Sequence, residues 1–330
     1  MTDAGPLRAS LGLALFSLAV FTASIAIGPA NLPIADAFGA LFDDSRAGLI
    51  IREIRLPRAL AAWLAGAALG ASGAAMQGLL RNPLADPGVL GVSAMAALGA
   101  VIAIYFNVSG LSGAATPIAA IAFALLATLI LQTLGAGRLS PTRLILVGVG
   151  LSSFAGALIA LAMNLAPNPF ILSDLVNWLF GSVANRSFDD LALTAPLIAA
   201  GLVAVLFAAP GLMALTLGEE AAASIGADLA RTRALAIAGA ALMTGASVAL
   251  AGAIGFVGII APHLARPFVS HDPGRAILPS ALVGGAILSA ADLVIRLLPF
   301  DQELKLGVAA ALVGAPAFIF VAARTQRIAR

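Results

Sequence analysis

The sequence contains no cysteine, which excludes disulfides, thiolate metal sites and cysteine catalysis. It has two histidines, His263 and His271, and no carboxylates at a ligand spacing beside them, so no metal site is predicted. The one lysine is Lys305, and there is no G-x-x-x-x-G-K-[ST] segment that could hold ATP phosphates. The sequence therefore offers no P-loop site for ATP.

Charged residues are also scarce. They make up 10% of the 330 residues, whereas hydrophobic residues make up 61%. A soluble domain is about one quarter charged, so this composition predicts a membrane protein. The formal net charge of +2 is small and its residues are scattered, so no nucleic-acid partner is predicted.

Long apolar runs follow one another along the whole chain. A helix needs about 20 apolar residues to cross a bilayer. Such runs lie at 11–30, 57–80, 88–106, 114–135, 144–166, 190–214, 233–254, 276–299 and 306–323, and a shorter run broken by glycine and proline lies at 254–268. We predict an all-α polytopic membrane protein with about ten transmembrane helices, in a single domain over 1–330. The first run is long, and no A-x-A-like cleavage site is followed by a soluble domain, so it is predicted to be retained.

Basic residues suggest an orientation. With ten spans and both termini in the cytoplasm, eleven basic residues fall inside, Arg138 and Arg330 among them, and seven outside, as the positive-inside rule favours. Much of the outside charge lies in RAGLIIREIRLPR (46–58). These arginines are either interfacial anchors or a cationic rim for an acidic partner.

Two segments resemble each other. RALAAWLAGAAL (58–69) and RALAIAGAAL (233–242) begin helices from opposite sides of the membrane, which is typical of an inverted-repeat transporter. Gly66 and Gly70 lie one helical turn apart and predict close helix packing.

Two other classes of protein are considered from the residues. A cation-coupled carrier needs a carboxylate within a span, and only Asp292 is well placed, but Arg296 follows one turn later and would neutralise it. GASG (70–73) matches the G-x-S-G of intramembrane serine proteases, with His263 as the only histidine in an apolar segment. A four-letter match in a chain rich in small residues is weak support for an enzyme.

Six ordered segments resemble the signatures of the FecCD-type permeases, the membrane subunits of ABC importers for iron siderophores, haem and cobalamin. They are RLPRALAAWLAGAALGASGAAMQGLLRNPLADPGVLGVS (55–93), NWLFGS (177–182), LGEEAAASIG (217–226), AGAIGFVGIIAPHLARPFV (251–269), AADLVIR (290–296) and LGVAAALVGAPAFIF (306–320). The resemblance implies a type II ABC importer permease of the bacterial inner membrane. It also implies a second permease subunit, two ATPase subunits that use ATP and Mg²⁺, and a periplasmic binding protein, with no cofactor on this chain.

The resemblance assigns roles to particular residues. The break RNPLADPGVLG (81–91) would carry the cytoplasmic gate, with its prolines ending the helix, Gly88 allowing the turn and Asn82 or Asp86 capping backbone ends. The cytoplasmic loop at about 215–232 would be the coupling helix that fits a groove on the ATPase. The implied gate residues are Asn82, Pro83 and Leu84; the ATPase-coupling residues are Gly218, Glu219, Glu220, Ala221, Ile225 and Gly226; the binding-protein docking residues are Arg55, Arg58 and Arg296. Further signature residues are Gln77, Arg81, Asp86, Pro87, Gly91, Gly255, Phe256, Gly258, Pro262, His263, Arg266 and Asp292.

The sequence departs from the family pattern at two places. Lys305-Leu306 replaces proline-valine before the last span, and Ser270-His271 follows the second long signature where a glycine is usual. His271 is expected to be a solvated surface residue. The cargo is expected to be a large metal chelate, a ferric siderophore first because Gly181-Ser182 is frequent among siderophore and haem members, with haem or cobalamin as the alternative.

Overall fold

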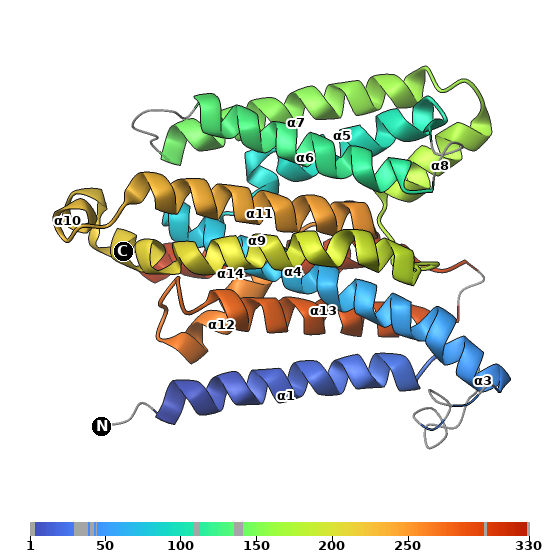
Figure 1. Ribbon diagram of the computed structural model, residues 1–330, viewed down its shortest axis with the longest axis horizontal. Helices are drawn as coiled ribbons and strands as arrows, with labels where there is room; N and C mark the ends of the chain where they lie inside the picture. Colours follow the sequence, from blue (N-terminus) through green and yellow to red (C-terminus); the bar gives the residue numbers. More distant parts are fainter. Residues whose placement is uncertain are drawn as a thin grey trace.

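The structure is a computed structural model that describes residues 4–29, 39, 43, 45–108, 113–134, 141–299 and 302–328. Its described part is helical and contains no strand (Figure 1). Residue 30 of the first predicted span, and Arg138 and Arg330 of the predicted inside charges, lie outside these residues.

The helices have the following bounds. They are α1 (Ala4–Ala26), α3 (Arg46–Leu49), α4 (Leu56–Leu80), α5 (Val92–Tyr105), α6 (Ala115–Leu134), α7 (Pro141–Asn164), α8 (Pro169–Leu179), α9 (Phe188–Ala214), α10 (Glu219–Ser224), α11 (Leu229–Ala251), α12 (Val257–Ala265), α13 (Ile277–Leu297) and α14 (Leu306–Ile328). A π-helical turn, Ile50–Arg55, joins α3 to α4, and 3₁₀ turns occupy Pro87–Leu90, Leu215–Leu217 and Arg266–Val269.

Six helical stretches among the described residues are long and apolar enough to cross a membrane. They are Arg46–Leu80, Ala115–Leu134, Thr142–Asn164, Phe188–Leu217, Leu229–Ala251 and Ile277–Leu297. Four shorter apolar helices, Ser10–Ala26, Val92–Tyr105, Val257–Val269 and Leu306–Phe320, fall on the remaining predicted runs. The prediction of an all-α polytopic membrane protein is confirmed.

The long helices lie side by side along one axis (Figure 1). The helices α5, α6 and α7 form one flank, α1 forms the other, and α4, α9, α11, α13 and α14 lie between them. One end of the bundle holds α10, the start of α1 and the end of α14; we name it the α10 end. The opposite end holds α3 and α8, and we name it the α8 end. The helices α4 and α11, which carry the repeated segments, run in opposite directions, as predicted.

The core is built around α4, whose small residues let neighbouring helices approach closely. A Cβ added at Gly66 would overlap the backbone carbonyl of Gly284 in α13, and one at Gly70 would overlap that of Ser280. These contacts confirm the close packing predicted for Gly66 and Gly70. Without a hydrophobic force between helices in lipid, such packing of small residues is a main source of helix association.

The structure differs from the predicted elements at two places. The helix α8 was not predicted; Asn168 begins it, because its Oδ1 accepts the Ile171 N–H at 2.9 Å, and Pro169 occupies its first turn. The span predicted from residue 57 begins earlier, because α3 and the π turn continue into α4. Pro57 has no N–H, and the preceding turn widens so that the Leu56 N–H bonds to the Ile51 carbonyl.

Candidate functional site

The break between α4 and α5 holds the predicted gate residues. The helix α4 ends at Leu80 and is followed by its C-cap residue Arg81, whose φ of 48° is left-handed. The Oδ1 of Asn82 accepts the Leu84 N–H at 2.9 Å, so the turn that contains Pro83 is capped by its own side chain. The gate residues therefore lie together in one tight turn.

The second half of the break is a 3₁₀ turn that begins at Pro87. The Oδ1 of Asp86 accepts the Gly88 N–H at 2.7 Å, as its predicted capping role requires. Gly88, predicted to allow the turn, lies within it, and a Cβ there would lie 2.8 Å from Oδ1 of Asp86. The left-handed residue is Gly91, with φ 78°, and a Cβ there would meet Leu151 of α7. Gly91 is needed for both its conformation and its close approach to α7.

The two long signature segments meet at the α10 end of α4. Gln77 is buried, its Nε2 donates to the Gly258 carbonyl of α12 at 3.3 Å, and its Oε1 accepts from Nη2 of Arg266 at 2.7 Å. A Cβ at Gly73 would overlap the Gly258 carbonyl, and a Cβ at Gly258 would overlap Oδ2 of Asp86. The gate turn is therefore braced by α12 through glycine contacts and one buried amide.

Left-handed backbone occurs within the second long signature (251–269) at Phe256 and directly after it at Ser270. Phe256, with φ 68°, precedes α12, and its ring centroid lies 6.3 Å from that of Phe318 in α14. Gly255 is exposed and Pro262 is buried within α12. Ser270 stands where the family pattern has glycine. Its φ of 53° is left-handed, and this conformation explains why glycine is usual at the position.

His271 is exposed, as predicted. His263 is also exposed, whereas Ser72 of the GASG segment is buried and donates from Oγ to the Leu69 carbonyl at 3.0 Å. Within the described part of the chain, no hydrogen bond joins Ser72 to His263. The geometry gives no support for a serine–histidine pair.

The predicted coupling loop forms a short helix, α10, outside the bundle. It begins at Gly218, with φ 97°, and ends before Gly226, with φ 85°, so both glycines are required by their conformation. Ala222 is buried beneath the helix, Ala221 and Glu220 are exposed, and Ile225 is 66% exposed. An apolar side chain is thus presented outward at the α10 end.

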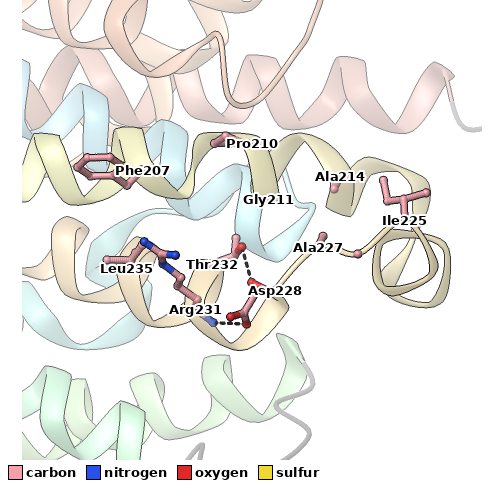
Figure 2. A pocket seen from close by; sticks show the side chains of 11 residues that line it. Phe207, Pro210, Gly211, Ala214, Ile225, Ala227, Asp228, Arg231, Thr232 and Leu235 are labelled. Carbon is pink, nitrogen blue, oxygen red and sulfur yellow. Dashed lines mark hydrogen bonds between the residues drawn. The ribbon is translucent and has the colours of Figure 1, made fainter.

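The loop is attached to the bundle by specific contacts. Glu219 forms an ion pair of 2.7 Å with Arg233 in the first turn of α11. Asp228 begins α11 by accepting the Arg231 N–H at 2.9 Å, and its carbonyl accepts from Oγ1 of Thr232 at 2.8 Å (Figure 2). A pocket of about 390 Å³ lies between the loop, α9 and α11, lined by Phe207, Pro210, Gly211, Ala214, Ile225, Gly226, Ala227, Asp228, Arg231, Thr232 and Leu235 (Figure 2).

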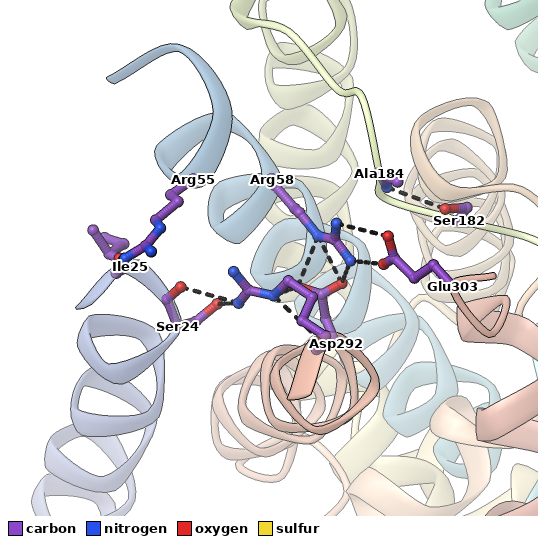
Figure 3. Close-up of polar contacts among 9 residues, drawn as sticks. Ser24, Ile25, Arg55, Arg58, Ser182, Ala184, Asp292 and Glu303 are labelled. Carbon is purple, nitrogen blue, oxygen red and sulfur yellow. Dashed lines mark hydrogen bonds and ion pairs between the residues drawn. The ribbon is translucent and has the colours of Figure 1, made fainter. Parts of the chain in front are cut away.

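The three predicted docking arginines lie together at the α8 end. Nη1 of Arg55 donates to the Ala26 carbonyl at 2.8 Å, and Nη2 of Arg296 donates to the Ser24 carbonyl at 3.0 Å, so both cap the last turn of α1. Arg58 projects between two carboxylates, Asp292 and Glu303 (Figure 3).

Asp292 is the centre of this arginine cluster. It is 1% exposed, its Oδ1 lies 2.8 Å from Nη2 of Arg58, and its Oδ2 lies 3.1 Å from Nε of Arg296. The pairing with Arg296 was predicted from the helical spacing. The pairings of Arg58 with Asp292 and Glu303, like that of Arg233 with Glu219, were not, because each joins separate elements. Nothing in the sequence singles out Glu303 as a partner of Arg58.

This arrangement defines the class of protein: a polytopic helical permease whose spans carry a short exposed helix at one end and a charged cluster at the other. The model of the FecCD transport family matches residues 15–324, and the chain belongs to this family. The family consists of membrane permeases of ABC transporters, so the chain is a transport subunit, and membership implies ATPase and binding-protein partners.

Several relatives are similar over nearly their whole length. The chain is 40% identical over 284 residues to the vitamin B12 import system permease protein BtuC of Salmonella paratyphi A, with 86% of each chain covered. It is 35% identical over 318 residues to the ABC transporter permease protein YvrB of Bacillus subtilis, with 92% of this chain and 90% of YvrB covered. A solved inward-facing structure of a metal-chelate type ABC transporter matches with a TM-score of 0.85 and 29% identity, covering 96% of this chain and 99% of that one.

Proposed function

We propose that this chain is the permease subunit of an inner-membrane importer for a bulky metal chelate, with a ferric siderophore as the first candidate. The observation that carries the proposal is the exposed helix α10, attached to the bundle through Ala222 and the Glu219–Arg233 ion pair while Glu220 and Ile225 face outward. A short rigid helix that projects from the spans suits a part that receives force from another subunit.

The energy source lies on partner chains. Two ATPase subunits bind ATP and Mg²⁺ at the α10 end, which is the cytoplasmic side, and this chain binds no cofactor. The coupling residues are Gly218, Glu219, Glu220, Ala221, Ile225 and Gly226. Closure of the ATPases moves α10 and, through Arg233 and Thr232, the packed helices α11 and α9.

A second copy of the permease covers α7 and α14. Only 17% of the apolar stretch of α7 is buried within the protein, against 83% of the stretch Arg46–Leu80. In α14, the side chains of Leu312, Val313 and Ile319 are each more than 60% exposed. The transport pathway runs between the two copies. The turn Asn82–Leu84, braced by α12, closes it on the cytoplasmic side.

A periplasmic binding protein docks at the α8 end, where Arg55, Arg58 and Arg296 meet acidic residues on its two lobes. Such charge pairs set register and the rate of encounter more than they supply affinity.

The cargo is a metal chelate whose choice rests with the binding protein. Gly181-Ser182 favours a siderophore, and the 40% identity to BtuC, whose name says that it imports vitamin B12, favours cobalamin as the second candidate. Haem is the remaining alternative. A cation-coupled carrier is disfavoured, because Asp292 is engaged by two arginines and is not available to a proton or sodium ion.

The test is purification of the chain from its native membrane in mild detergent, with identification of co-purifying subunits, followed by reconstitution in liposomes. We expect an ATPase and a binding protein, and ATP-dependent uptake of one of three probes: ferrichrome, cyanocobalamin or haemin. A complex whose ATPase carries a P-loop Lys→Ala substitution is the control and should not transport. Uptake without any ATPase would overturn the proposal.

A further inference from the structure

Arg58 has two carboxylate partners that differ in burial. Asp292, in the adjacent helix α13, is 1% exposed, and Arg58 binds it through Nε at 3.0 Å and Nη2 at 2.8 Å. Glu303, in the segment that connects α13 to α14, is 40% exposed, and it binds Nη1 at 3.2 Å and also Nη2 (Figure 3). One edge of the guanidinium is therefore hydrogen-bonded to a buried carboxylate, and the other edge to a carboxylate at the surface.

The neighbouring arginines are engaged on the inside. Arg55 is 4% exposed and also donates to the Ile25 carbonyl at 3.3 Å; the side chain of Arg296 is 4% exposed and donates to Oγ of Ser24 at 2.8 Å. A partner that displaced these contacts would leave buried carbonyls at the end of α1 without donors, which is unfavourable. Arg58 is thus the arginine of the cluster whose outward partner can be exchanged at low cost.

We propose that Glu303 occupies, in the undocked permease, the position on Arg58 that a carboxylate of the binding protein takes on docking. The inference rests on the proposed docking of that protein at the α8 end. Exchange of one carboxylate for another leaves Arg58 neutralised in both states, so no unpaired charge is buried at any stage. Glu303 therefore weakens docking by competition, and docking releases the segment that leads into α14 at Leu306.

The exchange fits a partner that must bind and leave in every transport cycle. Glu303 is 40% exposed, and an ion pair that water reaches contributes little net stability, so its loss is readily offset by the incoming carboxylate. Docking thereby becomes linked to the start of α14, which lies at the end of the bundle opposite the coupling helix α10 (Figure 1).

The test measures the affinity and association rate of the purified, co-purifying binding protein for the permease complex in nanodiscs. We expect Glu303→Gln to tighten docking by about threefold at low salt and by less at high salt. Glu53→Gln is the matched control, because Glu53 is exposed at the same end but makes no contact with Arg58 among the described residues. It should change docking by clearly less than Glu303→Gln.

A double-mutant cycle decides whether the effect acts through Arg58. In an Arg58→Gln background, Glu303→Gln should have no further effect, because the cation that pairs with Glu303 is gone. Equal effects of Glu303→Gln and Glu53→Gln, or an effect that persists without Arg58, would overturn the competition while leaving the docking site intact. Unchanged docking in Arg58→Gln itself would instead overturn the docking site, and this inference with it.

Discussion

Arg266 donates from Nη2 to Oε1 of Gln77 at 2.7 Å, although 189 positions separate the two residues in the chain. The same glutamine donates to the Gly258 carbonyl at 3.3 Å, so one buried amide joins α4, α12 and the turn after α12. The proposed gate turn at Asn82 begins five residues beyond Gln77. Its position is therefore set by a contact between the two long signature segments.

Replacement Gln77→Leu tests this contact. It removes the acceptor of a half-buried guanidinium and the donor to the Gly258 carbonyl, so we expect a loss of about 1–3 kcal/mol in stability and faulty closure of the gate. The measurements are the thermal midpoint in detergent and ATPase activity without binding protein, which should become uncoupled from transport. Gln302→Leu, at an exposed position before α14, is the control. A variant with wild-type stability and coupling would contradict the bracing role.

Reversal of charge at Glu220 tests the coupling helix. Glu220 is exposed, whereas Glu219 pairs with Arg233, so Glu220→Arg changes the surface offered to the ATPase without breaking that ion pair. A like-charge contact across an interface is strongly unfavourable, and we expect uptake and ATPase association to fall by about tenfold or more. Asp189→Arg makes the same change of charge at the opposite end and should leave ATPase association intact. Normal association of the Glu220→Arg protein would remove α10 from the interface.

The arginine cluster depends on Asp292. Replacement Asp292→Asn leaves Arg58 and Arg296 close together without their shared buried carboxylate, and breaking a buried pair in this way costs about 3–5 kcal/mol. Chemical unfolding in detergent should show this loss, and the loss should depend little on salt because Asp292 and both arginines are largely buried. Asp189→Asn, on an exposed carboxylate, should change stability by less than about 1 kcal/mol. A tolerated Asp292→Asn would mean that the cluster contributes little to folding.

Ser270 provides a test in which the substitution is expected to raise stability. Its φ of 53° disfavours a residue with a Cβ by about 1–2 kcal/mol, so Ser270→Gly should stabilise the protein by about 1 kcal/mol despite glycine's greater freedom when unfolded. The thermal midpoint should rise. Ser173→Gly, in the regular helix α8, should lower it instead. If both substitutions lower the midpoint, the left-handed position carries no strain.

Local features of the sequence were sufficient for part of the fold. Each apolar run became a helix, the Asp292–Arg296 pair follows from one helical turn, and Gly218 and Gly226 bound α10. These features depend on residues a few positions apart, for which helix geometry and backbone conformation leave few choices. The left-handed conformation of Gly91 was not predicted, because two glycines three positions apart are both compatible with a break after proline.

The contacts between distant segments were decided by tertiary structure alone. Among α4, α11 and α13, which are all rich in alanine and glycine, periodicity does not say which small residues face each other, yet Gly70 meets Ser280 and Gly66 meets Gly284. Likewise, a run of basic residues indicates charge but not partners. That Arg55 caps α1 while Arg58 bridges Asp292 and Glu303 follows from the approach of three helix ends, and such an approach depends on the packing of whole helix faces.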